Sequence, residues 1–413
     1  MKAELPAEAW RRNQLVMTVV VFVVFTGFAF VLPFLPLYVR ELGVHGEKQV
    51  AQWAGVLIGI APLLSGLLAP VWGRLADRHG QKRMAARALL SYVVLMVLSA
   101  FVTSVGQLFV LRAGIGLFGG IGPLGLAMAT SRAPREHTGR AVGSIQSAQI
   151  LSAAVGPLAG GLLADLIGIR WTFLVAAAAC AGSLGLLVAF YDEAPRPATR
   201  PADAAARAPL SAIVRLPHVA LLLLVLFLVN FVGRSFTPIL PLHLQTLGIA
   251  PARLAFATGL LISCYSVAAA ISASLLGRAS RRYAPRALLV TSLLAGAMVV
   301  WPMATVGSFE AVLALAILLG LASGGALTLC YTIGGLVVGG GQRTTAFGFF
   351  SAAALFGGAI SPSVAGLLVR WDLKAIYGVD AAIFVLLAAG LWLAAPRAAS
   401  HPAEASSPVN NSG

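Results

Sequence analysis

Three side chains that could do chemistry lie inside long apolar stretches: Arg112, Arg234 and His243. An ionisable residue in such a stretch is costly to place in a membrane, so it normally faces a polar cavity or a partner. Histidine titrates near neutral pH, so His243 could carry a proton; a histidine hydrogen-bonded at an interface is the alternative. Arg112 and Arg234 stay charged and would attract anionic groups. For Arg112, snorkelling to the outer interface is the alternative.

Neutral polar residues at similar depth could line the same cavity. They are Asn230, Gln146, Gln149, Tyr265 and Tyr331. No acidic residue falls in the middle of an expected span. The acids nearest to the spans lie toward their ends: Glu41, Asp77, Asp165 and Asp380. Two arginines without an acid give a positive bias, which favours a neutral, zwitterionic or anionic substrate. The residue that would couple transport to protons is left open, with Arg112, His243 and Asp77 as candidates.

Enzymatic, metal and disulfide chemistry find no support. The sequence contains no HExxH or GxSxG motif and no embedded carboxylate pair. Its three cysteines, Cys180, Cys264 and Cys330, are far apart and lack CxxC spacing. We therefore expect small apolar packing residues at these positions, no enzyme activity, no cofactor and no metal.

The composition places these residues in a membrane protein. Of 413 residues, 59% are hydrophobic and 10% charged, whereas a soluble domain is nearer half apolar and a quarter charged. This excludes a soluble enzyme, a disordered chain and a fibrous protein. The net charge of +15 lies in short clusters between apolar runs, so we expect a lipid bilayer as partner and no nucleic acid.

We expect an all-α membrane protein with twelve transmembrane helices. A span needs roughly 20 mostly apolar residues, and twelve such runs are present: 14–39, 51–72, 86–104, 107–130, 141–166, 171–191, 218–244, 254–276, 287–306, 311–336, 344–369 and 375–396. The first run follows Lys2, Arg11 and Arg12, as in a signal peptide. It is too long for one and lacks a small-residue cleavage site, so we interpret it as a retained span.

Loop charges predict the orientation. With both termini in the cytoplasm, 21 Lys and Arg residues fall inside, 6 fall outside and 2 lie within spans. This excess follows the positive-inside rule. Six tryptophans near the ends of the spans fit membrane-interface anchors: Trp53, Trp72, Trp171, Trp301, Trp371 and Trp392.

The two halves of the chain repeat each other. Residues 33–43 and 238–248 match at six of eleven positions, at an offset of 205. Pro157 and Gly161 align with Pro362 and Gly366 at the same offset. Because each half holds six spans, the halves have the same orientation and form parallel repeats, as in secondary transporters. We expect a cytoplasmic N-terminus (1–13), bundles over 14–191 and 218–396, a cytoplasmic linker (192–217) and a disordered cytoplasmic tail (397–413).

The loop between the second and third spans reads GRLADRHGQKR from Gly73 to Arg83. Its glycines permit a tight turn, and an acid before the next span can face a helix N-terminus or pair with arginines. We expect a conformational latch from Gly73, Asp77, Arg78, Gly80, Lys82 and Arg83. The loop resembles the signature of the major facilitator superfamily, although Gln81 stands where a basic residue is usual. The second half keeps only a degenerate copy around Gly277 and Arg278, and the resemblance covers about residues 14–396.

Two further features resemble one branch of that family, the twelve-span drug:proton antiporters. Span 5 contains Gly156, Pro157, Gly160 and Gly161, which resembles the antiporter GPxxGG motif. Arg112 resembles the family's span-4 arginine, implicated in proton coupling, but the usual glutamine after it is missing. The resemblance implies two six-helix bundles and export of small, amphipathic molecules across the bacterial inner membrane. It also implies proton antiport and alternating access, with a small-molecule substrate, protons as coupling ion and a monomer.

Other functions remain open at this point. They are export of an endogenous metabolite such as a siderophore or sugar, a proton-coupled uptake symporter, and a transporter-like sensor. A sensor would usually need an appended signalling domain, for which we see no room at either terminus.

Overall fold

The computed structural model describes residues 7–130, 137–193, 219–337 and 343–393, and these residues contain helices and no strand. The first half of the chain forms α1 (Ala7–Val31), α2 (Leu35–Glu41), α3 (Glu47–His79), α4 (Gln81–Ala100), α5 (Val105–Phe118), α6 (Ile121–Thr130), α7 (Thr138–Ile167) and α8 (Ile169–Phe190). The second half forms α10 (Val219–Ser235), α11 (Leu240–Thr246), α12 (Leu254–Ala279), α13 (Pro285–Val300), α14 (Phe309–Ser323), α15 (Ala326–Val337), α16 (Arg343–Leu368) and α17 (Ala375–Leu393).

Eleven of the twelve expected spans correspond to helical segments long enough to cross a bilayer. In the described part of the chain, ten helical segments are long and apolar enough to cross a bilayer, and α10 with α11, bent by 43°, makes an eleventh. The remaining span is divided into α5 and α6 at Gly119 and Gly120. Gly120 has a φ of +117°, a backbone conformation that glycine adopts without strain. The fold class expected from the sequence is therefore confirmed.

The helix α1 begins at Ala7, before the apolar run at 14–39, and its Arg12 and Asn13 bond to Asp192, which follows α8. The tail 397–413 and all of the linker except residues 192 and 193 lie outside the described residues.

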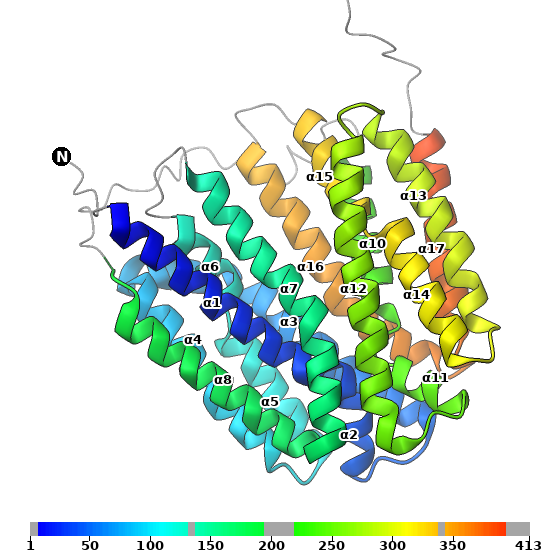
Figure 1. The fold of residues 1–413 in the computed structure, drawn as a ribbon, viewed down its shortest axis with the longest axis horizontal. Coiled ribbons are helices and arrows are strands. Elements are labelled where there is room, and N and C mark those ends of the chain that lie inside the picture. The colour runs from blue at the N-terminus through cyan, green and yellow to red at the C-terminus, as the bar shows by residue number, and fades with distance from the viewer. Residues whose placement is uncertain (1–6, 131–136, 194–218, 338–342, 394–413) are drawn as a thin grey trace, which may run out of the picture.

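Both described ends of the chain lie at one end of the molecule, which we call the termini end (Figure 1). The opposite end carries α2 and α11, and we call it the α2–α11 end. Apolar side chains cover the outer surface; Leu166, Met298 and Leu386 are each about 70% exposed. Such a surface requires a lipid environment.

Two helix pairs make the most extensive contacts between the halves, α3 with α16 and α7 with α12. The pairs use equivalent residues of the repeat. Gly55 lies against the carbonyl of Pro362, and Gly259 lies against the carbonyl of Pro157. A side chain at either glycine would collide with the opposing backbone. The residues that repeat in the sequence thus form the same contact at both junctions between the halves.

Hydrogen bonds between the halves are found near the α2–α11 end. Asp165 on α7 accepts bonds from the backbone N–H groups of Ala255 and Phe256, at 3.3 and 2.8 Å. Further bonds join Arg40 to Gln245, Leu158 to Ser263 and Ser363 to Gly55. These hydrogen bonds fasten the halves to each other near the α2–α11 end.

Candidate functional site

A cavity of about 210 Å³ lies in the second half, among α10, α12, α14, α15 and α17. Its polar lining residues are Asn230, Arg234, Tyr265 and Ser323. Apolar residues such as Leu319, Leu327 and Phe384 form the rest of the wall. An apolar pocket with a few convergent polar groups is typical of a small-molecule site.

Arg234 supplies the positive charge of this cavity. It lies in the last turn of α10, just before the bend into α11, near the middle of the bent pair of helices. Its side chain is exposed to the cavity and lies close enough to Tyr265 for electrostatic interaction. Phe236 holds the Tyr265 ring in an edge-to-face contact, with centroids 5.7 Å apart. The guanidinium is thus available to a ligand.

Three of the six predicted cavity residues, Arg234, Asn230 and Tyr265, do line this cavity. The other three do not. Gln146 and Gln149 lie on α7 in the first half, and the Tyr331 ring stacks on Phe347 with centroids 5.8 Å apart. The position of these three residues along their spans suggested a place in the cavity. That position does not show which face of its helix a residue occupies.

His243 lies on α11, away from the cavity lining. It is fully buried, and its Nδ1 lies 2.8 Å from the hydroxyl of Tyr377 on α17. Its Nε2 has no hydrogen-bond partner in the described part of the chain. The structure therefore places His243 in a buried, hydrogen-bonded contact near the α2–α11 end.

Asp380 was missed by the sequence analysis, which found no acid away from the span ends. It lies on α17 one turn after Tyr377 and is fully buried. Its Oδ2 accepts a hydrogen bond from Ser235 Oγ at 2.5 Å, and its Oδ1 has no partner among the described residues. An acid in an otherwise apolar helix was the available signal, but its position five residues from the helix start suggested an interfacial location.

Arg112 is buried in the first half, with 1% of its surface exposed. Its Nε donates a hydrogen bond to the carbonyl of Leu57 on α3, at 3.2 Å, and its Nη1 has no partner in the described structure. Snorkelling to the interface is therefore wrong for this residue. A buried cation with so few hydrogen bonds does not stabilise the fold, because its desolvation costs more free energy than these bonds return.

The glycines of span 5 occupy two contacts of α7. Gly156 and Gly160 approach α1 of the same half, whereas Gly161 approaches the backbone of Ala255 on α12 of the other half. Pro157 presents its carbonyl to Gly259. The motif therefore lies where the two halves meet, as a conformational role requires.

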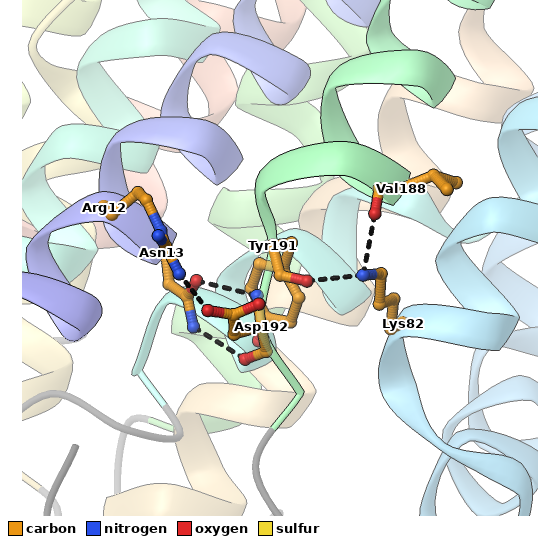
Figure 2. Close-up of polar contacts among 6 residues, drawn as sticks. All are labelled: Arg12, Asn13, Lys82, Val188, Tyr191 and Asp192. Atoms are coloured by element: carbon orange, nitrogen blue, oxygen red, sulfur yellow. Dashed lines mark hydrogen bonds and ion pairs between the residues drawn. The ribbon is translucent and has the colours of Figure 1, made fainter.

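The stretch 73–83, expected as a loop, is helical except at Gly80, because α3 runs to His79 and α4 begins at Gln81. It is tied to its own half. Lys82 Nζ donates hydrogen bonds to the carbonyls of Val188 and Tyr191, at 2.9 and 2.5 Å, at the C-terminal end of α8 (Figure 2). Beside it, Asp192 forms an ion pair with Arg12 and bonds to Asn13 (Figure 2). These contacts join α1, α4 and α8 at the termini end.

The other residues of the expected latch are placed as follows. Gly80 has a φ of +103° between α3 and α4, which explains a glycine there, and Gly73 borders a second cavity with Trp72 and Gly120. Arg78 and Arg83 are exposed, and the side chain of Asp77 lies outside the described structure. No contact with the second half is found for the described residues of this loop, so the latch stays a proposal.

The family is decided by sequence similarity over almost the whole chain. The sequence model of the Major Facilitator Superfamily matches residues 17–259 and 254–411. The chain belongs to the major facilitator superfamily. It is a transporter and not an enzyme, as the sequence analysis predicted.

Characterised relatives and solved structures agree with this membership. The chain is 31% identical to the multidrug resistance protein MdtG of Citrobacter koseri, over 93% of this chain and 95% of the relative. It is 32% identical to MdtG of Proteus mirabilis, over 79% and 81%. A bacterial homologue of the lysosomal transporter Spinster has a TM-score of 0.78 at 17% identity, covering 94% of this chain and 97% of that one. The nucleoside transporter NupG has a TM-score of 0.73 at 14% identity, covering 92% and 99%.

The superfamily fold explains why the Lys82 contact recurs in the second half. Arg286, the repeat-related residue at the start of α13, donates hydrogen bonds to the carbonyls of Leu391 and Trp392 at the end of α17. Both cations thus satisfy carbonyls that a helix C-terminus leaves free, and both oppose the negative end of the helix dipole.

Replacing Lys82 with alanine is expected to destabilise the purified transporter by about 1 kcal/mol, because the end of α8 loses a charged donor. Arg286→Ala should have a similar effect on α17. The measurement is the melting temperature in detergent, with Arg83→Ala, an exposed neighbour, as matched control. An equal loss of stability in Arg83→Ala would contradict a specific role for Lys82.

Proposed function

We propose that this transporter exports small amphipathic molecules across the bacterial inner membrane by proton antiport. The printed name of the relatives at 31–32% identity, a multidrug resistance protein, supports export of drugs. The observation that carries the proposal is the cavity within the second half, where one arginine and a few neutral polar groups meet an apolar wall. Such a lining suits molecules with both apolar and polar parts.

Alternating access is the proposed mechanism. The hydrogen bonds and the paired glycine contacts fasten the halves near the α2–α11 end. With both termini in the cytoplasm, as loop charges predict, this arrangement corresponds to a state open to the cytoplasm. Rocking of one half against the other would open the α2–α11 end to the periplasm.

Inverted membrane vesicles from a host without its own drug pumps test this function. Vesicles containing the protein should accumulate norfloxacin, a zwitterionic drug, when a proton gradient is imposed, and a protonophore should abolish the accumulation. Norfloxacin accumulation that is unchanged by the protonophore would contradict proton antiport. Accumulation only in right-side-out vesicles would indicate import and contradict export.

Arg234 is expected to set the charge preference of the cavity. Arg234→Glu should lower export of an anionic probe, carboxyfluorescein, roughly tenfold, about 1.4 kcal/mol, because a favourable charge contact becomes repulsive. Initial rates in the inverted vesicles measure this, with ethidium as the cationic probe and Arg281→Glu, an exposed change, as control. Good export of ethidium together with no effect of Arg234→Ala would contradict the preference.

A further inference from the structure

We propose that Asp380 is the proton-binding carboxylate of this transporter and that Ser235 links its protonation to the substrate cavity. The inference rests on the proposed proton antiport and names the group that would carry the proton. None of the candidates from the sequence, Arg112, His243 or Asp77, is needed for this role.

The burial of Asp380 is the first support. Among carboxylates whose side chains the structure describes, it is the one that is fully buried. In the described part of the chain, its one hydrogen bond comes from Ser235, and Oδ1 has no partner there. Burying a charged carboxylate away from water costs free energy when one of its oxygens has no hydrogen bond. Binding a proton neutralises the carboxylate and removes that cost.

The charged and titratable groups around Asp380 do not neutralise it. Tyr377 on its own helix and Tyr265 on α12 are phenols within electrostatic range. Arg234 on α10 faces the cavity, and no ion pair between it and Asp380 is found in the described structure. His243 on α11 bonds to Tyr377 instead, and Lys374, which precedes α17, interacts with His243. The described side chains of α13 and α16 bring no charge to this carboxyl.

The location of Asp380 connects it to the cavity. Phe384 is one turn further along the same face of α17 and lines the cavity wall. Val232, in the same turn of α10 as Ser235, and Phe236, which directly follows α10, line it too. Asp380 therefore lies directly behind the wall that a substrate would touch, and adjacent to the helix turn that carries Arg234.

Ser235 gives the protonation state a structural consequence. Its Oγ lies 2.5 Å from Asp380 Oδ2 and 2.9 Å from the carbonyl of Val232. When Asp380 is charged, the hydroxyl proton points to the carboxylate. When Asp380 is protonated, its own O–H donates to Ser235 Oγ and the serine proton turns to Val232. Proton binding thus switches hydrogen bonds at the bend between α10 and α11, next to Arg234.

Proton binding is tested directly on the full-length protein in lipid by infrared difference spectroscopy during a pH titration. A protonated buried carboxyl gives a C=O stretching band that a carboxylate lacks. We expect the wild type to show this band, Asp380→Asn to lose it, and Ser235→Ala to shift its titration midpoint. Asp372→Asn, an exposed acid before the same helix, should keep it. A band that persists in Asp380→Asn would overturn the proposal.

Transport separates this inference from the function on which it rests. In proteoliposomes, Asp380→Asn should reduce proton-driven norfloxacin accumulation roughly tenfold or more while exchange of norfloxacin across the membrane without a gradient continues. Retained exchange also shows that the variant is folded. If wild type shows no proton-driven accumulation, proton antiport fails. If wild type is coupled and Asp380→Asn is equally coupled, only the assignment of Asp380 fails.

Discussion

Replacing Gly259 with leucine is expected to lower export about tenfold or more while the protein still folds and inserts. A side chain at this position would collide with the backbone carbonyl of Pro157 on α7. Overpacking costs up to about 3 kcal/mol, which would lower the population of the state with a closed α2–α11 end roughly 150-fold relative to the opposite state. Because each cycle of the proposed alternating access passes through both states, export should fall by about tenfold or more. Gly55→Leu should act alike, since it meets Pro362 in the equivalent contact.

Two measurements check this expectation. Initial export rates in inverted vesicles report the loss of transport, and spin labels at Lys48→Cys and Arg253→Cys report the separation of the halves at the α2–α11 end, where both residues are exposed. The labels should move apart in Gly259→Leu. Gly182→Leu is the matched control, since a side chain at Gly182 meets nothing within 4 Å. Normal export with unchanged label distances in Gly259→Leu would show that this contact does not govern the cycle.

The spans and the repeat could be predicted from the sequence because both depend on order along the chain. Apolar runs of bilayer length are read directly, and the pairs Pro157–Pro362 and Gly161–Gly366 share one offset. In the structure these repeated residues form the same contact twice, at the two junctions between the halves. The sequence did not indicate that the contact partners would be glycines of α3 and α12.

The candidate site was predicted only in part, because the face of each helix is decided by tertiary packing. Depth along the chain selected Arg234, Asn230 and Tyr265, which do share a cavity. The same criterion selected Gln146, which does not, and passed over Asp380, which is near the start of α17 yet fully buried. An apolar helix has little periodicity to show which side faces lipid, so a polar residue's surroundings there come from its neighbours in space.

The contacts of Arg112 do not stabilise the fold enough to explain why an arginine occupies this position. It is buried, with one hydrogen bond to Leu57 and an unpaired Nη1 in the described structure. The equivalent position of the second half is Ile317, so the fold accommodates an apolar side chain there. Replacing a buried, poorly paired charge with a hydrophobic residue of similar volume is often neutral or stabilising.

We therefore expect Arg112→Leu to melt at the same or a higher temperature than wild type, and to lose proton-driven export by roughly tenfold or more. Melting in detergent and initial rates in inverted vesicles are measured on the same preparations, with Arg281→Leu, an exposed arginine, as the control that should change neither. Loss of stability in step with loss of export would assign Arg112 to structure, through its bond to Leu57. Retained stability with lost export requires that the charge itself acts in the transport cycle, because the leucine variant changes little else in this buried position.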